Sequence, residues 1–417
     1  MIYMNNYSNR QPLPPIRRGS YQGSNYGRGN FGNSYEPEPK KPKKTVRKTN
    51  KKIIYRGQID YVILLCVILL VAIGIIMVFS SSYYTAGQGE DGDMYAFLKR
   101  DIIYSAIGFV AMYIVSRIDY QFLKPWVKFI YFGSIILLLL VFTPLGVVHN
   151  GARRWLNFGF EFQPSEIAKF ALIITLADVL DRNPNMLSSW KGVFRYLGIM
   201  ILPTGIVALE NLSTAIVIGG ISVVLLFVYS PKIRYSLAIG AAGMAGVIAM
   251  IFGSWRSDRV EAWLHPESVS TEKGYQVLQS LYSVASGGMF GLGIGGSRQK
   301  LGYMPEAQND IIFAIICEEL GWFGAAIVVT LFIVLIWRGI YIAIRNSKEP
   351  FAMLLATGIT SMIAIQVIIN IAVVTNTIPN TGIPLPFISY GGTSLVMMLA
   401  SMGLLMNISR YHGKERG

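Results

Sequence analysis

The chain has 417 residues, of which 53% are hydrophobic and only 14% charged, and its formal net charge is +14. A soluble domain carries about 25% charged residues, so this chain cannot cover a water-facing surface of its own size. Thirteen of the 37 Lys and Arg residues fall before residue 60. The positive charge therefore sits on a tail, which argues against a nucleic-acid partner.

Residues 1–58 are rich in Gly, Asn, Ser, Pro, Tyr and basic residues, with almost no aliphatic clusters. Such a segment cannot bury enough apolar area to offset its ordering entropy, so we predict a disordered basic cytoplasmic tail. Residues 40–52 hold eight of its basic residues. They either lie against anionic cytoplasmic lipid or act only as a topology signal.

The first apolar run, 61–84, exceeds the roughly 20 residues that cross a bilayer, and it lies too far from the start to be a signal peptide. Nine more runs predict an all-α polytopic membrane protein with ten transmembrane helices, a membrane domain over 59–410 and a short cytoplasmic tail over 411–417. These later runs lie at 102–117, 129–146, 165–181, 194–209, 212–230, 235–253, 311–337, 352–375 and 385–407.

Basic residues set the orientation. With the tail in the cytoplasm, the inner segments carry 27 of the 37 Lys and Arg residues. The positive-inside rule then places both termini in the cytoplasm, as an even number of spans requires. Cys66 and Cys317 lie in apolar runs and the three histidines are scattered, so we expect neither a disulfide framework nor a His-based metal site.

Arg153 and Arg154 fall in the outer loop between the third and fourth spans, beside Trp155. Two guanidinium groups at the membrane surface suit a phosphate or pyrophosphate, because each offers a planar fork to anionic oxygens. The alternative is that both side chains only reach lipid headgroups.

Glu166 and Lys169 are three residues apart at the start of the fourth span, so both lie on one helix face. Ionisable groups at membrane depth usually face a cavity or the bundle interior. The pair therefore either lines an outer cavity or is a structural ion pair.

The outer loop between the seventh and eighth spans, 254–310, is far longer than usual, and such loops are commonly functional. Its Gly291–Gly296 stretch fits GxGxxG, but no βαβ unit surrounds it, so we read these glycines as a re-entrant bend. The proline-rich segment 379–386 is predicted to be a stiff, non-helical wall of a site. Together these features indicate an outer polar cavity for an anionic, lipid-linked ligand.

Five sequence blocks occur along the chain in this order: Gly151-Ala-Arg-Arg-Trp155, Phe162-Gln-Pro-Ser-Glu-Ile-Ala-Lys169, Gly274-Tyr-Gln276, Glu318-Glu-Leu-Gly321 and Pro384-Leu-Pro-Phe-Ile-Ser-Tyr-Gly-Gly392. Together they resemble the SEDS family, which comprises FtsW, RodA and SpoVE. The resemblance covers nearly all of residues 60–410, and Pro305-Glu-Ala307 favours the FtsW and SpoVE branch of division and sporulation.

The resemblance implies a peptidoglycan glycosyltransferase that polymerises lipid II outside the cytoplasmic membrane, together with a class B penicillin-binding protein and other division proteins. It implies pyrophosphate contacts from Arg153, Arg154 and Arg259, and a cavity shaped by Glu166 and Lys169. A divalent cation, Mg or Mn, could share the charge of the pyrophosphate. The outer mouth of the cavity would be framed by Lys300, Glu306 and Asp310.

The chain departs from the family where an essential Asp is expected. Counting back from Gly274 reaches Val269, which cannot accept a proton. Glu267 and Glu272 lie two and three residues away, and either could substitute as the catalytic base. The alternatives are a non-catalytic scaffold for the penicillin-binding protein, or a lipid II transporter.

Overall fold

The computed structural model describes residues 54–56, 58–88, 93–149, 152–159, 161–252, 257–267, 272–300 and 307–413. All of them belong to one compact unit, Lys52–Gly417. Of the tail predicted over 1–58, all but four residues lie outside the described ranges, so its disorder stays a prediction.

Long helices make up most of the described chain, which confirms the all-α class. The bounds are α1 (Tyr61–Gly87), α2 (Ala96–Arg117), η1 (Tyr120–Trp126), α3 (Val127–Leu140), α4 (Pro164–Arg182), η2 (Met186–Ser188), α5 (Trp190–Glu210), α6 (Leu212–Tyr229), α7 (Ile233–Phe252), α8 (Ser257–Leu264), α9 (Glu272–Ser286), α10 (Ile312–Arg345), α11 (Pro350–Val374) and α12 (Gly392–Arg410).

Seven helical segments of the described chain are long and apolar enough to cross a membrane: α1, η1 with α3, α5, α6, α10, α11 and α12. The other three predicted spans coincide with α2, α4 and α7. Charged side chains near their ends lower the apolar character of α2 and α4. The chain is thus a multi-pass membrane protein, and the number ten stays a prediction.

The helix α1 begins directly after Asp60, whose carboxylate accepts hydrogen bonds from the N–H groups of Val62 (3.1 Å) and Ile63 (3.4 Å). Such a cap contributes about 1 kcal/mol to a helix. The same carboxylate pairs with Arg338 of α10 at 2.6 Å. Asp60 therefore fixes both the start of α1 and its contact with the second half of α10.

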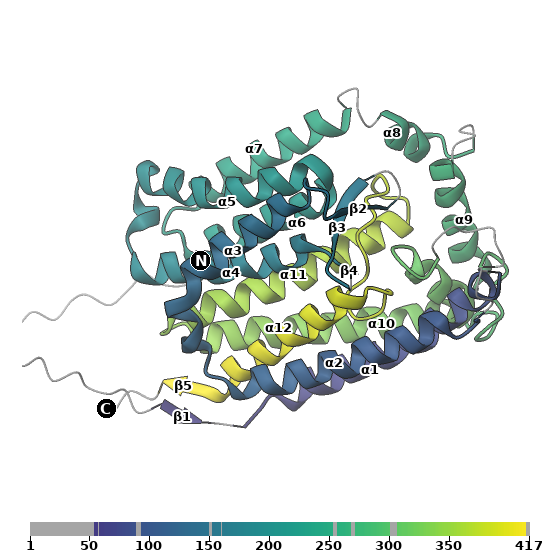
Figure 1. Ribbon diagram of the computed structural model, residues 1–417, viewed down its shortest axis with the longest axis horizontal. Coiled ribbons are helices and arrows are strands. Elements are labelled where there is room, and N and C mark those ends of the chain that lie inside the picture. The colour runs from purple at the N-terminus through teal and green to yellow at the C-terminus, as the bar shows by residue number, and fades with distance from the viewer. Residues whose placement is uncertain are drawn as a thin grey trace, which may run out of the picture. The chain divides into compact units, whose positions relative to one another are not determined.

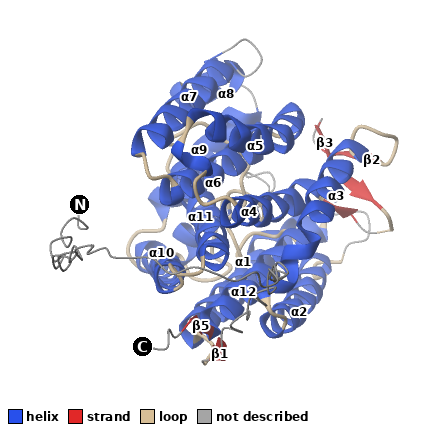
Figure 2. Ribbon diagram, turned by 90° about the vertical axis from the view of Figure 1, so that its left-hand side faces the viewer, coloured by secondary structure: helices blue, strands red, loops and turns tan. Residues whose placement is uncertain are grey.

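Within this unit, α11 is an interior helix that contacts α10, α6 and α4, while α2 lies along α12 and α1 lies along α10 and α2 (Figures 1 and 2). Close approach needs glycine: a Cβ at Gly108 of α2 would lie 2.4 Å from Leu399 of α12. The outward faces carry large exposed apolar side chains, such as Leu65 and Phe129. Exposed apolar faces on long helices suit a hydrocarbon environment.

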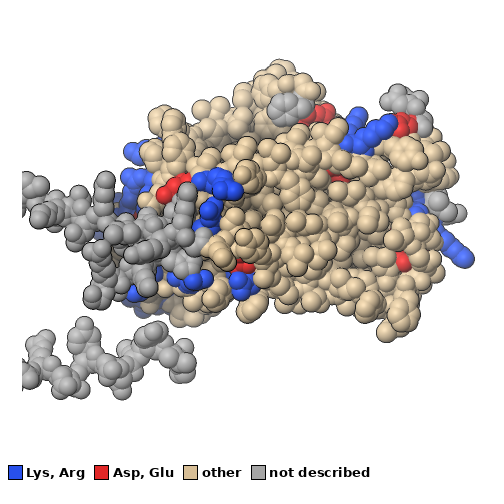
Figure 3. Space-filling view, turned by 90° about the horizontal axis from the view of Figure 1, so that it is seen from below, with Lys and Arg blue, Asp and Glu red and all other residues tan. Residues whose placement is uncertain are grey.

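Charge is concentrated at the ends of the bundle. In Figure 3, Lys and Arg gather at both ends, mostly at the end where β1 (Ile54–Arg56) and β5 (Tyr411–Gly413) lie, and the middle is almost free of charge. The strands β1 and β5 pair antiparallel, so the chain enters α1 and leaves α12 at one end. The placement of both termini in the cytoplasm stays a prediction.

The predicted loop between the third and fourth spans forms a small antiparallel sheet, which the sequence interpretation missed. Its strands are β2 (Gly146–His149), β3 (Ala152–Asn157) and β4 (Glu161–Phe162), in the order β2-β3-β4. The long loop is also partly helical, because α8 and α9 lie within it.

Candidate active site

Buried ionisable side chains gather at one end of the helices. Asp101 lies early in α2, Glu166 in the first turn of α4, and Glu319 early in α10. Each of these helices carries a basic residue in its last turn, at its other end. The buried charges therefore lie at the end predicted to face outward.

The Glu166–Lys169 pair is present and buried. Lys169 Nζ lies 2.8 Å from Glu166 Oε1, and the side chains are 1% and 7% exposed. Ser394 of α12 donates a hydrogen bond of 3.0 Å to the other carboxylate oxygen of Glu166. The pair thus joins α4 to the start of α12, and removal of either partner would leave an uncompensated buried charge.

Several polar atoms near these helix starts are buried and have no hydrogen-bond partner among the described residues. They are one carboxylate oxygen of Asp101 and the hydroxyls of Ser105, Ser165 and Thr393. Asp101 and Ser105 are one turn apart on the face of α2 that Gly108 presents to α12. Since buried polar groups are normally satisfied, these atoms mark where water or a polar substrate group would bind.

A second buried network surrounds Lys300. Its ammonium lies 2.7 Å from Glu319 Oε1 and 2.9 Å from the hydroxyl of Ser80, which itself donates to Glu319 at 2.8 Å. The carboxylate of Glu318 accepts from Ser297 Oγ (2.6 Å) and from the N–H of Arg298 (2.9 Å). Lys300 was predicted at the outer mouth, but it is 6% exposed and joins α1 to α10.

The glycine-rich segment forms the predicted bend. Backbone N–H groups of Leu292 and Gly293 donate to the carbonyls of Glu318 and Glu319, both at 3.0 Å. At Gly321 the helix α10 is interrupted, with φ at 67°. A Cβ there would lie 2.4 Å from the nitrogen of Gly291, so the two glycines permit this close approach. The element before the segment is the helix α9, which removes the dinucleotide interpretation.

Arg153 and Arg154 are neighbours in β3, so their side chains leave opposite faces of the strand. Arg154 Nε donates to the backbone carbonyl of Glu210 at 3.2 Å, at the end of α5. Arg153 is exposed, and its backbone N–H donates to the Glu210 carboxylate at 3.3 Å. The hairpin is thus fastened to α5, and Arg153 is the more accessible of the two for an anionic ligand.

The proline-rich segment is held by α8, α9 and α11, and its role as the wall of a site stays a prediction. Arg259 Nη1 donates to the carbonyl of Asn380 at 3.1 Å, and the Asn380 amide donates to Gln276 at 3.0 Å. Asn370 of α11 donates to the backbone carbonyls of Asp310 (2.7 Å) and Ile383 (2.8 Å).

The residues that directly follow the proline-rich segment pack against α1 at Gly74. A Cβ at Gly74 would lie 2.7 Å from the backbone oxygen of Phe387, a buried residue with a positive φ of 64°. Such backbone is rare for a bulky side chain and persists only where packing enforces it. Gly74 permits that packing.

Glu267 and Glu272, the two candidates for the catalytic base, lie on either side of position 269. Glu267 is exposed just beyond α8, and Glu272 is the first residue of α9, though its side chain is outside the description. Val269 and Glu306 also lie outside the described ranges. Within those ranges, no group of three or more His, Cys, Asp or Glu side chains could hold a metal ion. The Mg or Mn ion stays a prediction, and part of its ligands would come from pyrophosphate oxygens.

Sequence reasoning did not assign a site role to Ser80, Asp101, Glu318, Glu319 or Thr393. Two adjacent acids in an apolar run, at 318 and 319, were a usable signal, because such residues require buried partners. Ser80 and Thr393 gave no such signal, since hydroxyls are common in membrane helices.

Comparison with known proteins gives consistent results. The family model FTSW_RODA_SPOVE, described as "Cell cycle protein", matches residues 60–414. Stage V sporulation protein E of Bacillus subtilis (strain 168) is 42% identical over 357 residues, covering 84% of this chain and 97% of its own length. A protein of Geobacter sp. (strain M18) named "Probable peptidoglycan glycosyltransferase FtsW" is 37% identical, covering 84% and 96%.

Two solved structures share the fold at 24% sequence identity. One, described as "Structural coordination of polymerization and crosslinking by a peptidoglycan synthase complex", has a TM-score of 0.69 and covers 84% of this chain and 98% of that one. The other, the rod shape determining protein RodA of Thermus thermophilus, has a TM-score of 0.63 and covers 84% and 97%.

Proposed function

The chain belongs to the FtsW, RodA and SpoVE family, and from that premise we propose that it is a peptidoglycan glycosyltransferase that polymerises lipid II. The relatives named as glycosyltransferases align over nearly their whole length, so the similarity is not confined to a shared segment. The 42% identity to a sporulation protein supports a role in septal wall synthesis, in division or sporulation.

The reaction is a displacement at the anomeric carbon of a MurNAc residue. The 4-hydroxyl of an acceptor GlcNAc forms the new C–O bond, the bond from that carbon to pyrophosphate breaks, and undecaprenyl pyrophosphate departs. The hydroxyl proton passes to a base, for which Glu267 or Glu272 is the candidate. Positive charge must stabilise the departing pyrophosphate, and the exposed Arg153 supports that role.

The observation that carries this proposal is the group of buried polar atoms around Glu166 and Lys169. A lipid-linked sugar brings hydroxyl, amide and pyrophosphate groups to the membrane surface, and these need polar partners that bilayer lipid does not offer. Asp101, Ser165 and Thr393 have buried atoms with no partner in the described chain. They suit such a substrate better than they suit a packed apolar core.

We place the site on the outer face of the cytoplasmic membrane, with both termini in the cytoplasm. The positive-inside count and the pairing of β1 with β5 at the basic end support this orientation. For a partner we propose a class B penicillin-binding protein, since one structural neighbour comes from a complex that couples polymerization with crosslinking.

A scaffold without polymerase activity is the second candidate, and Val269 is the observation that favours it. A lipid II transporter would need a charged path to the cytoplasmic end. Most of the described buried charges instead lie at the predicted outer end, with Asp178 as an exception near the cytoplasmic end of α4, which favours a surface reaction over transport.

The test uses purified full-length protein, labelled lipid II and the partner penicillin-binding protein, with glycan polymer measured on gels. We expect polymer from the wild-type protein. One of Glu267→Gln or Glu272→Gln should lower the rate by about 10²- to 10⁴-fold, which is the usual contribution of a general base.

Glu261→Gln is the matched control, because Glu261 is an exposed acid in the same loop, on α8. Polymer that is insensitive to both test substitutions would refute their role as bases. Absence of polymer from a folded wild-type protein that still binds its partner would support the scaffold instead.

A further inference from the structure

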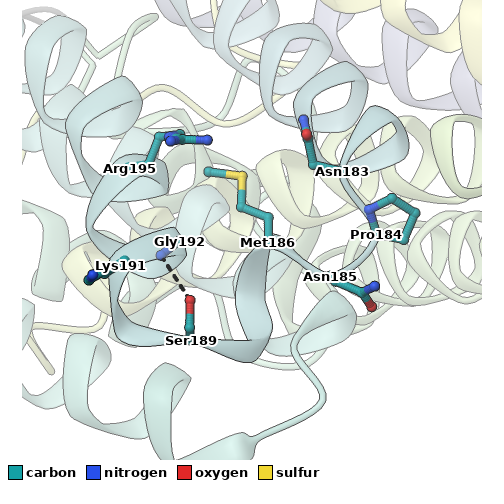
Figure 4. A pocket seen from close by; sticks show the side chains of 8 residues that line it. All are labelled: Asn183, Pro184, Asn185, Met186, Ser189, Lys191, Gly192 and Arg195. Carbon is teal, nitrogen blue, oxygen red and sulfur yellow. Dashed lines mark hydrogen bonds between the residues drawn. The ribbon is translucent and has the colours of Figure 1, made fainter.

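A pocket of about 440 Å³ opens at the other end of the bundle, between the end of α4 and the start of α5 (Figure 4). Its size falls in the range of ligand pockets, roughly 300–1,000 Å³. It lies far along both helices from Glu166 and from the sheet, so the proposed reaction does not use it. The polar and basic part of its lining comprises Asn183, Asn185, Ser189, Lys191 and Arg195.

Two cations of this lining have no counter-ion among the residues that the structure describes. Lys191 and Arg195 are exposed, and no ion pair joins either to a carboxylate within the described chain. They are four residues apart, so both lie on one face of α5. Two other cations at this end of the bundle do have counter-ions. Arg182 pairs with Asp178 at 2.8 Å, and Lys124 pairs with Asp181 at 2.6 Å. Asp178 and Asp181 are thus already paired with other cations.

The pocket also has an apolar element. Met186 is buried, 8% exposed, and in Figure 4 it lies between Arg195 on α5 and Asn183 on the turn after α4. A ligand with an anionic head and an adjoining apolar part would match this combination of groups. The planar guanidinium of Arg195 suits a phosphate, which it can bind through two parallel hydrogen bonds.

The aromatic residues beside the two cations indicate the position of the pocket relative to the bilayer surface. Trp190 and Phe194 each precede one of the cations, are 46% and 64% exposed, and have ring centroids 6.1 Å apart. Exposed aromatic rings, Trp above all, are enriched where the bilayer meets water. The cationic face of α5 therefore lies at headgroup level, beside a face that suits the acyl boundary.

We propose that this pocket binds the phosphate headgroup of an anionic phospholipid of the cytoplasmic leaflet. Lys191 and Arg195 would contact the phosphate, and the amide of Asn185 would contact the rest of the headgroup. Basic pockets between membrane helices on the cytoplasmic side are suited to such headgroups. The proposal depends on the membrane placement of the chain and not on its enzymatic activity.

The test is lipid retention by the full-length protein in detergent, measured by native mass spectrometry during titration with phosphatidylglycerol or phosphatidylcholine. We expect selective retention of one phosphatidylglycerol. Lys191→Gln and Arg195→Gln should each weaken it about fivefold, and the double variant about thirtyfold, since a basic residue at the surface contributes about 1 kcal/mol. If the double variant does not fold, the two single variants provide the test.

The matched control is the double variant Lys128→Gln and Arg345→Gln. It removes one exposed lysine and one exposed arginine from predicted inner segments outside the pocket lining. We expect it to retain phosphatidylglycerol like the wild type. Equal losses in the control and pocket variants would overturn the proposal, as would equal retention of phosphatidylcholine. Displacement of the lipid by millimolar inorganic phosphate would show a site for free anions and overturn the lipid assignment.

Discussion

The buried ammonium of Lys300 allows the outer network to be tested by a single substitution, Lys300→Met. The methionine keeps an unbranched side chain that is one atom shorter than lysine, and it removes the charge. Glu319, which is 0% exposed, would then keep, among the described residues, only the hydroxyl of Ser80 and the N–H of Ser297 as partners. A carboxylate in that position is buried without a counter-charge.

The expected loss is about 3–5 kcal/mol, the usual cost of removing one partner of a buried ion pair. That is a large part of a typical stability of about 5–15 kcal/mol. The double variant Lys300→Met with Glu319→Gln should recover most of the loss, because neither member of the pair is then charged and the glutamine keeps a hydrogen-bonding group near Ser80. The double-mutant cycle measures the coupling between the two side chains.

The assay is thermal unfolding in nanodiscs, followed by fluorescence-detected size exclusion, for the single and double variants. The matched control is Lys99→Met, which breaks a pair of similar length, 2.8 Å to Asp93, with side chains 63% and 37% exposed. Exposed pairs contribute little, so the control should unfold close to the wild type. If Lys300→Met unfolds at the same temperature as the wild type, or if the double variant is as unstable as Lys300→Met, the reasoning is refuted.

Three further predictions rest on contacts described above, with stability measured by thermal unfolding and polymer formation measured on gels. Gly74→Ala should cost about 1–3 kcal/mol through overpacking, whereas Gly133→Ala, with no atom within 4 Å of a new Cβ, should not destabilise. Glu166→Gln should destabilise by leaving Lys169 unpaired, while adding Lys169→Met should restore stability but not polymer formation. Asp60→Ala should destabilise more than Asp60→Asn, because only the asparagine can still cap α1.

Much of the fold could be predicted from the sequence, because the hydrophobic runs exceed the length that crosses a bilayer. The runs at 61–84 and 352–375 differ from α1 and α11 by at most a few residues at their ends. The sheet formed by β2, β3 and β4 was missed for a physical reason. Its strands are only two to six residues long, and residues 146–162 show no clear alternation of polar and apolar side chains.

The site was only partly predictable. Glu166 and Lys169 were found because their spacing is local to one helix, and the structure confirms that they pair. The partners of Lys300 are 19 and 220 residues away, and no periodicity in the sequence reports such a contact. Arg154 shows a different limit of sequence reasoning. Its residue type predicted a contact to phosphate, whereas in the structure its Nε donates to the backbone carbonyl at the end of α5.

The missing aspartate leads to a last prediction, in which chemistry and stability can be separated. The helices on either side of position 269 are both fastened to the segment 376–380, α8 through Arg259 and Trp263 and α9 through Gln276. Since these hydrogen bonds do not involve residue 269, Val269→Asp should change the chemistry of the loop without weakening the contacts of α8 and α9 with the segment 376–380. We expect faster polymer formation at an unchanged melting temperature.

Val269→Asn separates the two possible causes of such a gain, because it has nearly the same shape and polarity as the aspartate but cannot act as a base at neutral pH. If only the aspartate raises the rate, proton acceptance at 269 limits the wild-type reaction, and the register of the loop matches that of the family. An equal gain from asparagine would contradict the assignment. A rise in melting temperature with either variant would attribute the gain to folding, because a base placed in a preformed frame adds no stability of its own.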